Sequence, residues 1–177
     1  MNENNEKFQG KYRVHTACLR NWNYGDVGSY FVTICTNRHE CNLGYILNNE
    51  FIPFEMSKIV AVEWIKTFEM RQDMNLQLDK FIVMPNHIHA IIHIGENKYN
   101  KALDINSNLY GVQSKNLPAI IRGFKASVKK QAIANKIKFE WQPRYHEHII
   151  RTESAYQLIA EYIENNPERW RQDKFYR

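Results

Sequence analysis

The stretch that decides the fold is Phe81-Ile82-Val83-Met84-Pro85-Asn86-His87-Ile88-His89-Ala90-Ile91-Ile92-His93-Ile94. Two apolar runs flank Pro85-Asn86, a pair that ends a strand and favours a turn. The pattern predicts a β-hairpin with strands over residues 76–84 and 87–94. Because side chains alternate across a strand, His87 and His89 project from one face, and the apolar residues between and after them supply the buried face.

The segments before this hairpin predict a strand, a second short strand and a helix, and the segments after it predict a helix, a strand and a helix. In chain order the expected elements are a strand over 30–36, a short strand near 43–47, a helix over 57–69 capped by Ser57, a helix over 117–135, a strand over 145–150, and a helix that a capping box of Ser154 and Gln157 opens and that stops near Pro167. This order predicts an α+β fold of ferredoxin-like type, an antiparallel sheet with helices gathered on one face and a C-terminal tyrosine-bearing helix.

The 177 residues fit a single domain, 1–177, with a polar N-terminal arm over 1–28 and a mobile loop over 95–116. No stretch approaches the roughly 18 consecutive apolar residues of a membrane helix. Residues 1–6 are polar and acidic, unlike a signal peptide. We therefore expect a cytoplasmic protein that does not enter a membrane.

Positive charge is concentrated in residues 114–151, which hold nine basic and two acidic residues, whereas the whole chain has a net charge of +5. A basic face attracts phosphate backbones, and aromatic residues beside it, such as Trp141, suit unpaired bases. The pattern favours single-stranded nucleic acid as the partner. A solvated helix face is the alternative reading of the same charges.

His87 and His89 lie two apart on a strand, about 6–7 Å along the backbone, so one divalent cation can bind both. His93 lies about 20 Å from His87 along the strand and cannot join it. Two imidazoles make an incomplete site, and a third ligand must come from elsewhere. The alternative is an exposed polar stripe.

On the last helix, Tyr156 belongs to the apolar stripe and is expected to pack in the core. Tyr162 falls at the edge of that stripe, and Asn166, four residues on, shares its face. A phenol and an amide oxygen presented together indicate a nucleophile beside a metal ligand. Ordinary packing is the alternative for Tyr162 taken alone.

Four segments together resemble one family. Residues 81–89 resemble the His-hydrophobe-His strand of single-tyrosine HUH transposases, and residues 141–151 the segment before their catalytic helix. Residues 161–167, Glu161-Tyr162-Ile163-Glu164-Asn165-Asn166-Pro167, resemble the Tyr-Ile-x-x-Asn-Pro signature of REP-associated tyrosine transposases. Residues 30–38 resemble their first strand. The match runs from about residue 21 to residue 170.

The resemblance implies that Tyr162 is the nucleophile and that His87, His89 and Asn166 bind Mg²⁺ or Mn²⁺. It implies cleavage of single-stranded DNA, flanked by a hairpin or palindromic element, and strand transfer through a 5′-phosphotyrosine intermediate. Lys125, Trp141 and Arg144 are candidate DNA contacts. Some relatives are homodimers that exchange the tyrosine helix and others are monomers, and the sequence does not choose between them.

Two other functions stay open at this point. One is a non-catalytic single-stranded nucleic-acid-binding module on the same fold, driven by residues 114–151. The other is a replication-initiation or plasmid-mobilisation nickase of the same superfamily, which usually carries further domains or a second tyrosine.

Overall fold

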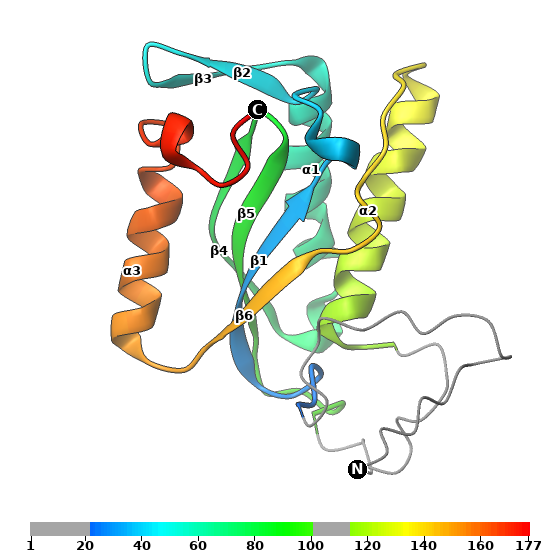
Figure 1. The fold of residues 1–177 in the computed structure, drawn as a ribbon. Helices are drawn as coiled ribbons and strands as arrows, with labels where there is room; N and C mark the ends of the chain where they lie inside the picture. Colours follow the sequence, from blue (N-terminus) through cyan, green and yellow to red (C-terminus); the bar gives the residue numbers. More distant parts are fainter. Residues whose placement is uncertain (1–21, 101–113) are drawn as a thin grey trace, which may run out of the picture.

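The computed structural model describes residues 22–100 and 114–177, and its centre is a four-stranded antiparallel sheet (Figure 1). The strands lie in the order β4-β5-β1-β6, with β1 over Gly28–Cys35, β4 over Leu76–Met84, β5 over His87–Ile94 and β6 over His146–Ile150. With α1 over Glu55–Glu69 and α2 over Leu117–Ala134, the chain follows a β-α-β-β-α-β order, and α3 over Glu153–Glu164 comes after it. The α+β class and the antiparallel sheet are confirmed.

The predicted hairpin is present, with Met84 paired to His87 across the Pro85-Asn86 turn. One irregularity interrupts it. Leu78 pairs with Ile92 and Phe81 with Ala90, so Asp79 and Lys80 together face one residue of β5. This is a β-bulge, which bends a strand and redirects its side chains.

The helices lie on both faces of the sheet, so the expectation that they gather on one face is wrong (Figure 1). Helices α1 and α2 cover the face that carries Tyr30, Val32 and Ile88. Helix α3 covers the other face through Ala160 and Ile163. That second face also holds apolar residues, Ile91 and Ile150, which must be shielded from water as well.

Two of the three predicted helix starts are shifted, and the third, at residue 117, is where α2 begins. Helix α1 begins at Glu55, and the Ser57 hydroxyl donates to the Phe54 carbonyl instead of capping the helix. Helix α3 is capped by Thr152, whose hydroxyl accepts from the Ala155 amide, and Ser154 lies inside the helix. The short strand near 43–47 is β2 over Gly44–Leu47, which pairs with β3 over Glu50–Pro53 in a second, small sheet. Three short 3₁₀ helices complete the described structure, over Asn37–His39, Gln72–Met74 and Trp170–Gln172.

Most of the predicted polar arm and of the predicted mobile loop lies outside the described residues. The described start of that loop is held by hydrogen bonds, because Asn97 donates to the Met74 carbonyl and Asn100 to the Gly25 carbonyl. Within residues 22–100 and 114–177, no helix has both the length and the apolar character that crossing a membrane requires.

Candidate metal and nucleophile site

His87 and His89 project from β5 onto the face of the sheet that α3 covers, and both are essentially inaccessible to solvent. Their ring centroids lie 4.3 Å apart. Burial lowers the pKa of both imidazoles below the ordinary value, and for His89 the neighbouring His87 adds to the effect. Both rings are therefore neutral at pH 7, the state in which an imidazole binds a metal.

A hydrogen bond orients each imidazole through its Nδ1. The side-chain oxygen of Asn86 lies 2.9 Å from Nδ1 of His87, and the Thr33 hydroxyl lies 2.8 Å from Nδ1 of His89. Metal-binding histidines are held in this way, with one ring nitrogen on a protein group and the other free for the ion. Of the two Nε2 atoms, that of His87 has no hydrogen-bond partner in the protein, and that of His89 lies 3.1 Å from the Tyr162 hydroxyl.

Tyr162 reaches this histidine pair from α3. Its hydroxyl lies 3.1 Å from Nε2 of His89 and donates to Oδ2 of Asp173 at 2.8 Å. The pKa of Tyr162 is raised, first by burial and then by the hydrogen bond and negative charge of Asp173. The phenol is thus close to the imidazoles but protonated, and it needs a positive charge nearby to ionise.

Asn166 and Asp173 supply oxygen atoms from the chain after α3. The helix ends at Glu164, so Asn166 lies in the following turn, where it is buried and donates through Nδ2 to Oδ2 of Asp173 at 3.0 Å. Burial raises the pKa of Asp173, but hydrogen bonds from the Phe175 amide, Asn166 and Tyr162 more than offset it, and the pKa lies below its ordinary value. Asp173 is therefore a carboxylate at neutral pH.

These residues fit a divalent cation. Ligand atoms of His87, His89 and Asp173 all lie within 4.8 Å of one another. Nε2 of His87 and Oδ1 of Asn166 are buried and have no hydrogen-bond partner, which is costly unless another group binds them. Two imidazoles and two oxygens form a ligand set that suits Mn²⁺, and the oxygens also suit Mg²⁺.

The C-terminal segment, red in Figure 1, turns back from α3 to the end of the sheet. Its Phe175 ring lies against both histidines of the pair. The Phe175 ring centroid lies 4.8 Å from that of His87 and 6.0 Å from that of His89. Asn86 fixes the segment, since its Nδ2 donates to the Phe175 carbonyl at 2.8 Å. The same amide side chain thus orients His87 and holds the segment above it.

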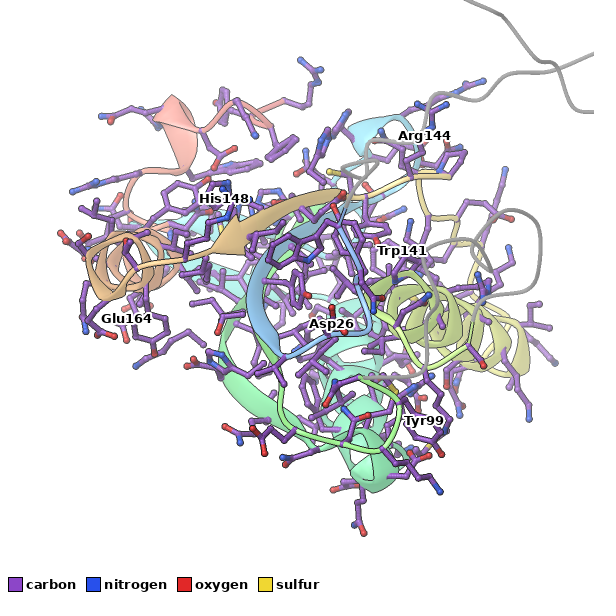
Figure 2. All side chains as sticks on the ribbon, turned by 90° about the horizontal axis from the view of Figure 1, so that it is seen from below. Asp26, Tyr99, Trp141, Arg144, His148 and Glu164 are labelled. Atoms are coloured by element: carbon purple, nitrogen blue, oxygen red, sulfur yellow. The ribbon has the colours of Figure 1, made fainter. Side chains whose placement is uncertain are left out.

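The three candidate DNA contacts lie apart from this cluster. Figure 2 shows Trp141 and Arg144 toward α2, on the other side of the sheet from Glu164 of α3. Lys125 donates to the carbonyls of Gln142 and Arg144 at 2.7 and 2.8 Å, and burial lowers its pKa to about 8. Trp141 is half-buried, with its ring 4.8 Å from that of Phe139, whereas Arg144 is exposed. Lys125 and Trp141 thus already contact other groups of the protein, and the side chain of Arg144 is the one of the three that is exposed to solvent.

The structure brings together Tyr162, His87, His89 and Asn166, and it adds three residues for which the sequence made no prediction of a role: Thr33, Asn86 and Asp173. Thr33 is the cross-strand partner of His89, which the register of two antiparallel strands could have indicated. Asp173 lies seven residues beyond Asn166 in a segment without periodicity, and no sequence signal identifies it. His93 is separate from the pair, as expected, with Nε2 2.5 Å from a carboxylate oxygen of Asp79.

Comparison with known proteins gives the chain a family. It is 38% identical over 175 residues to an uncharacterized protein of Haemophilus influenzae, in a match that covers 94% of this chain and 95% of that protein. The chain belongs to the same family as that protein. No protein-family model matches it.

The fold is that of a known transposase. The solved structure of a REP-associated tyrosine transposase bound to a REP hairpin matches with a TM-score of 0.56 and 22% sequence identity, over 93% of this chain and 76% of that one. The resemblance to REP-associated tyrosine transposases is therefore confirmed at the level of the fold. The predicted pair of histidines is also found, in a group of residues that could hold a metal ion.

Proposed function

We propose that the chain is a metal-dependent single-strand DNA endonuclease and strand transferase that uses Tyr162 as its nucleophile. The observation that carries this proposal is the position of the Tyr162 hydroxyl, 3.1 Å from a buried imidazole that belongs to a metal-binding cluster. A buried tyrosine that only packs also needs a hydrogen-bond partner for its hydroxyl. What supports the proposal is that both partners of the Tyr162 hydroxyl, His89 and Asp173, belong to the group that can hold a metal.

His87 and His89 would hold the ion, with Asp173, Asn166 or both as oxygen ligands. When bound, Mg²⁺ or Mn²⁺ polarises the phosphate, offsets its developing negative charge and opposes the raised pKa of the neighbouring phenol. Thr33 and Asn86 keep the imidazoles in the orientation that this binding requires.

In the proposed reaction, the Tyr162 oxygen attacks the phosphorus of a phosphodiester, and the bond from phosphorus to the 3′ oxygen breaks. The products are a 5′-phosphotyrosine and a 3′ oxygen, which takes up a proton from water and becomes a free 3′-hydroxyl. Asp173 already accepts the phenolic hydrogen bond and is the nearest group that can take the proton. Because the phosphodiester energy is kept in the tyrosine ester, a 3′-hydroxyl can reverse the step and join strands without ATP.

The proposed substrate is single-stranded DNA beside a hairpin or palindromic element. The transposase of similar fold is bound to a REP hairpin. Residues 114–151 supply the positive charge for such a partner. Arg144, which is exposed, is the first candidate contact, and Lys125 and Trp141 are the second and third candidates.

One observation favours a second function, a non-catalytic module that binds single-stranded nucleic acid. The ring of Phe175 covers both imidazoles, and the side chains of His87 and His89 are closed to solvent. If this segment never leaves, DNA can bind elsewhere on the surface without reaching Tyr162.

A hairpin oligonucleotide with a single-stranded flank, labelled at the 5′ end or at the 3′ end, separates the two functions. With Mn²⁺, the enzyme proposal requires a covalent adduct that keeps the 3′ label and releases a 5′-labelled fragment. Tyr162→Phe must abolish the adduct, and the double variant His87→Ala/His89→Ala must do the same while still binding DNA. Binding that persists in all variants, with no adduct in the parent chain, would establish the binding module instead.

A further inference from the structure

A chain of hydrogen bonds crosses the sheet on the face of α3, away from the histidine pair. The Ser29 hydroxyl on β1 lies 2.6 Å from Nδ1 of His93 on β5, and Nε2 of His93 lies 2.5 Å from Oδ2 of Asp79 on β4. The chain ends on α3, where the Tyr156 hydroxyl donates to Oδ1 of Asp79 at 3.2 Å. Three adjacent strands and the helix that carries Tyr162 are thus joined through one carboxylate.

The β-bulge of β4 makes this connection possible. Asp79 and Lys80 are the two residues that face a single residue of β5, so the strand bends here and its side chains leave the regular alternation. Both bulge residues contact α3, because Lys80 forms an ion pair with Glu164 at the C-terminal end of the helix. Asp79 binds the first half of α3 and Lys80 binds its last residue.

Tyr162 lies between these two attachments. It is six residues after Tyr156 and two before Glu164, about 9 Å and 3 Å along the helix axis. Two points fix the helix against rotation and sliding better than one does. The attachments therefore bear directly on where the Tyr162 hydroxyl stands relative to His89.

Apolar packing covers one side of α3. Ala160 and Ile163 are its buried residues, and Tyr156 and Tyr162 are half-buried against the same cluster. A cavity of about 330 Å³ adjoins the first half of the helix, and Ser29, Asp79, His93 and Tyr156 are among its lining residues. Because Tyr156 packs on one side and borders open space on the other, the hydrogen bond to Asp79 adds a directional contact to the packing of its ring.

We propose that the β4 bulge is a positioning device for the nucleophile: Asp79, supported by His93 and Ser29, and Lys80 hold α3 so that the Tyr162 hydroxyl faces His89. This inference rests on the proposed function, since it assigns Tyr156 and Asp79 as positioning residues of that reaction. In the contacts described above, neither Tyr156 nor Asp79 touches Tyr162 or the histidine pair. A displacement of about 1 Å at a reacting group can lower a rate roughly a hundredfold, so a loose helix is enough to impair the reaction.

The test compares two Tyr→Phe variants that each remove one tyrosine–aspartate hydrogen bond. Tyr156→Phe breaks the contact with Asp79, and Tyr99→Phe breaks a contact of 2.9 Å with Asp73, far from α3 in the chain. With saturating Mn²⁺ and hairpin DNA, we expect Tyr156→Phe to lower the rate constant for adduct formation roughly tenfold or more. The dissociation constant for DNA should stay within about twofold of that of the parent chain, and Tyr99→Phe should leave both constants unchanged. A purely structural role of Tyr156 would lower the melting temperature and leave the rate constant of the folded protein as in the parent.

Hydrogen exchange supplies a readout that needs no catalysis. Peptides from residues 153–164 should exchange faster in Tyr156→Phe than in the parent chain and at the parent rate in Tyr99→Phe. If the parent chain forms no adduct, the proposed function fails, and exchange still decides whether the bulge holds the helix. An unchanged rate constant in an active parent background, or unchanged exchange over α3, would overturn the positioning role.

Discussion

The Tyr162 hydroxyl donates to Oδ2 of Asp173 at 2.8 Å, although the two residues lie on opposite sides of the turn that reverses the chain after α3. The same carboxylate belongs to the group that includes His87 and His89. Asp173 thus contacts the proposed nucleophile and also stands where an ion would bind. The sequence indicates Asn166 as the oxygen ligand. Substitution of Asp173 therefore tests which of the two residues supplies the oxygen that binds the metal.

Asp173→Asn should lower the affinity for Mn²⁺ roughly ten- to a hundredfold, because a charged ligand is replaced by a neutral one. Isothermal titration with Mn²⁺ measures this directly. Asp73→Asn is the matched control, since Asp73 also accepts from a tyrosine hydroxyl but lies outside the cluster. Unchanged affinity in Asp173→Asn, with a large loss in Asn166→Ala, would assign the oxygen ligand to Asn166.

Thr33→Val tests the orientation of His89. The substitution keeps the shape of the side chain and removes the hydroxyl that lies 2.8 Å from Nδ1. We expect roughly a ten- to hundredfold weaker binding of Mn²⁺ and a matching loss in the rate of adduct formation at limiting Mn²⁺. Thr67→Val, which removes a buried hydroxyl that donates to a backbone carbonyl inside α1, should leave both quantities unchanged. Equal behaviour of the two variants would show that Thr33 does not orient the ligand.

The sequence predicts the hairpin of β4 and β5 because two apolar runs of strand length flank a proline and an asparagine. It fails for the placement of α3. On the face that α3 covers, Ile91 lies between two histidines of the same strand, so this face has the pattern of a polar surface. A single buried isoleucine between polar neighbours gives too weak a periodic signal to predict a covering helix.

The candidate site, like the fold, has features that the sequence predicts and features that it does not. The two imidazoles and the phenol are predictable, because strand alternation and a short signature place them. Asp173 is not, because its position depends on how the chain turns back after Pro167, and no repeat or spacing encodes that turn. Lys125 shows a further limit, since charge alone cannot tell a lysine that faces solvent from one that binds two backbone carbonyls.

Lys125 should make stability depend on pH in the alkaline range. Burial lowers its pKa to about 8 in the folded chain, whereas an unfolded lysine has a pKa of about 10.4. Between these values the unfolded state binds a proton that the folded state does not, so this lysine makes the free energy of unfolding rise with pH. Below pH 8 Lys125 is charged in the folded state, and the full cost of burying that charge lowers the free energy of unfolding.

Urea unfolding between pH 7 and 10 checks this expectation. The free energy of unfolding of the parent chain minus that of Lys125→Met should increase from pH 8 to pH 10. Lys130→Met, at an exposed position of the same helix, controls for the substitution itself. A difference that stays constant or falls over this range contradicts a buried Lys125 with a lowered pKa.

Tyr162 should act on DNA bound by its own chain. Only two residues, Arg151 and Thr152, join the end of β6 to the start of α3, and two residues span at most about 7 Å. With this link, and with the Tyr162 hydroxyl 3.1 Å from His89 of the same chain, α3 stays on its own sheet. An equimolar mixture of Tyr162→Phe and His87→Ala/His89→Ala should therefore form no covalent adduct with hairpin DNA, even after the two chains are unfolded and refolded together. If one chain carries a size tag, gel electrophoresis shows which chain is linked to DNA. An adduct on the chain that lacks both histidines would show that two protomers exchange α3 and complete each other's site.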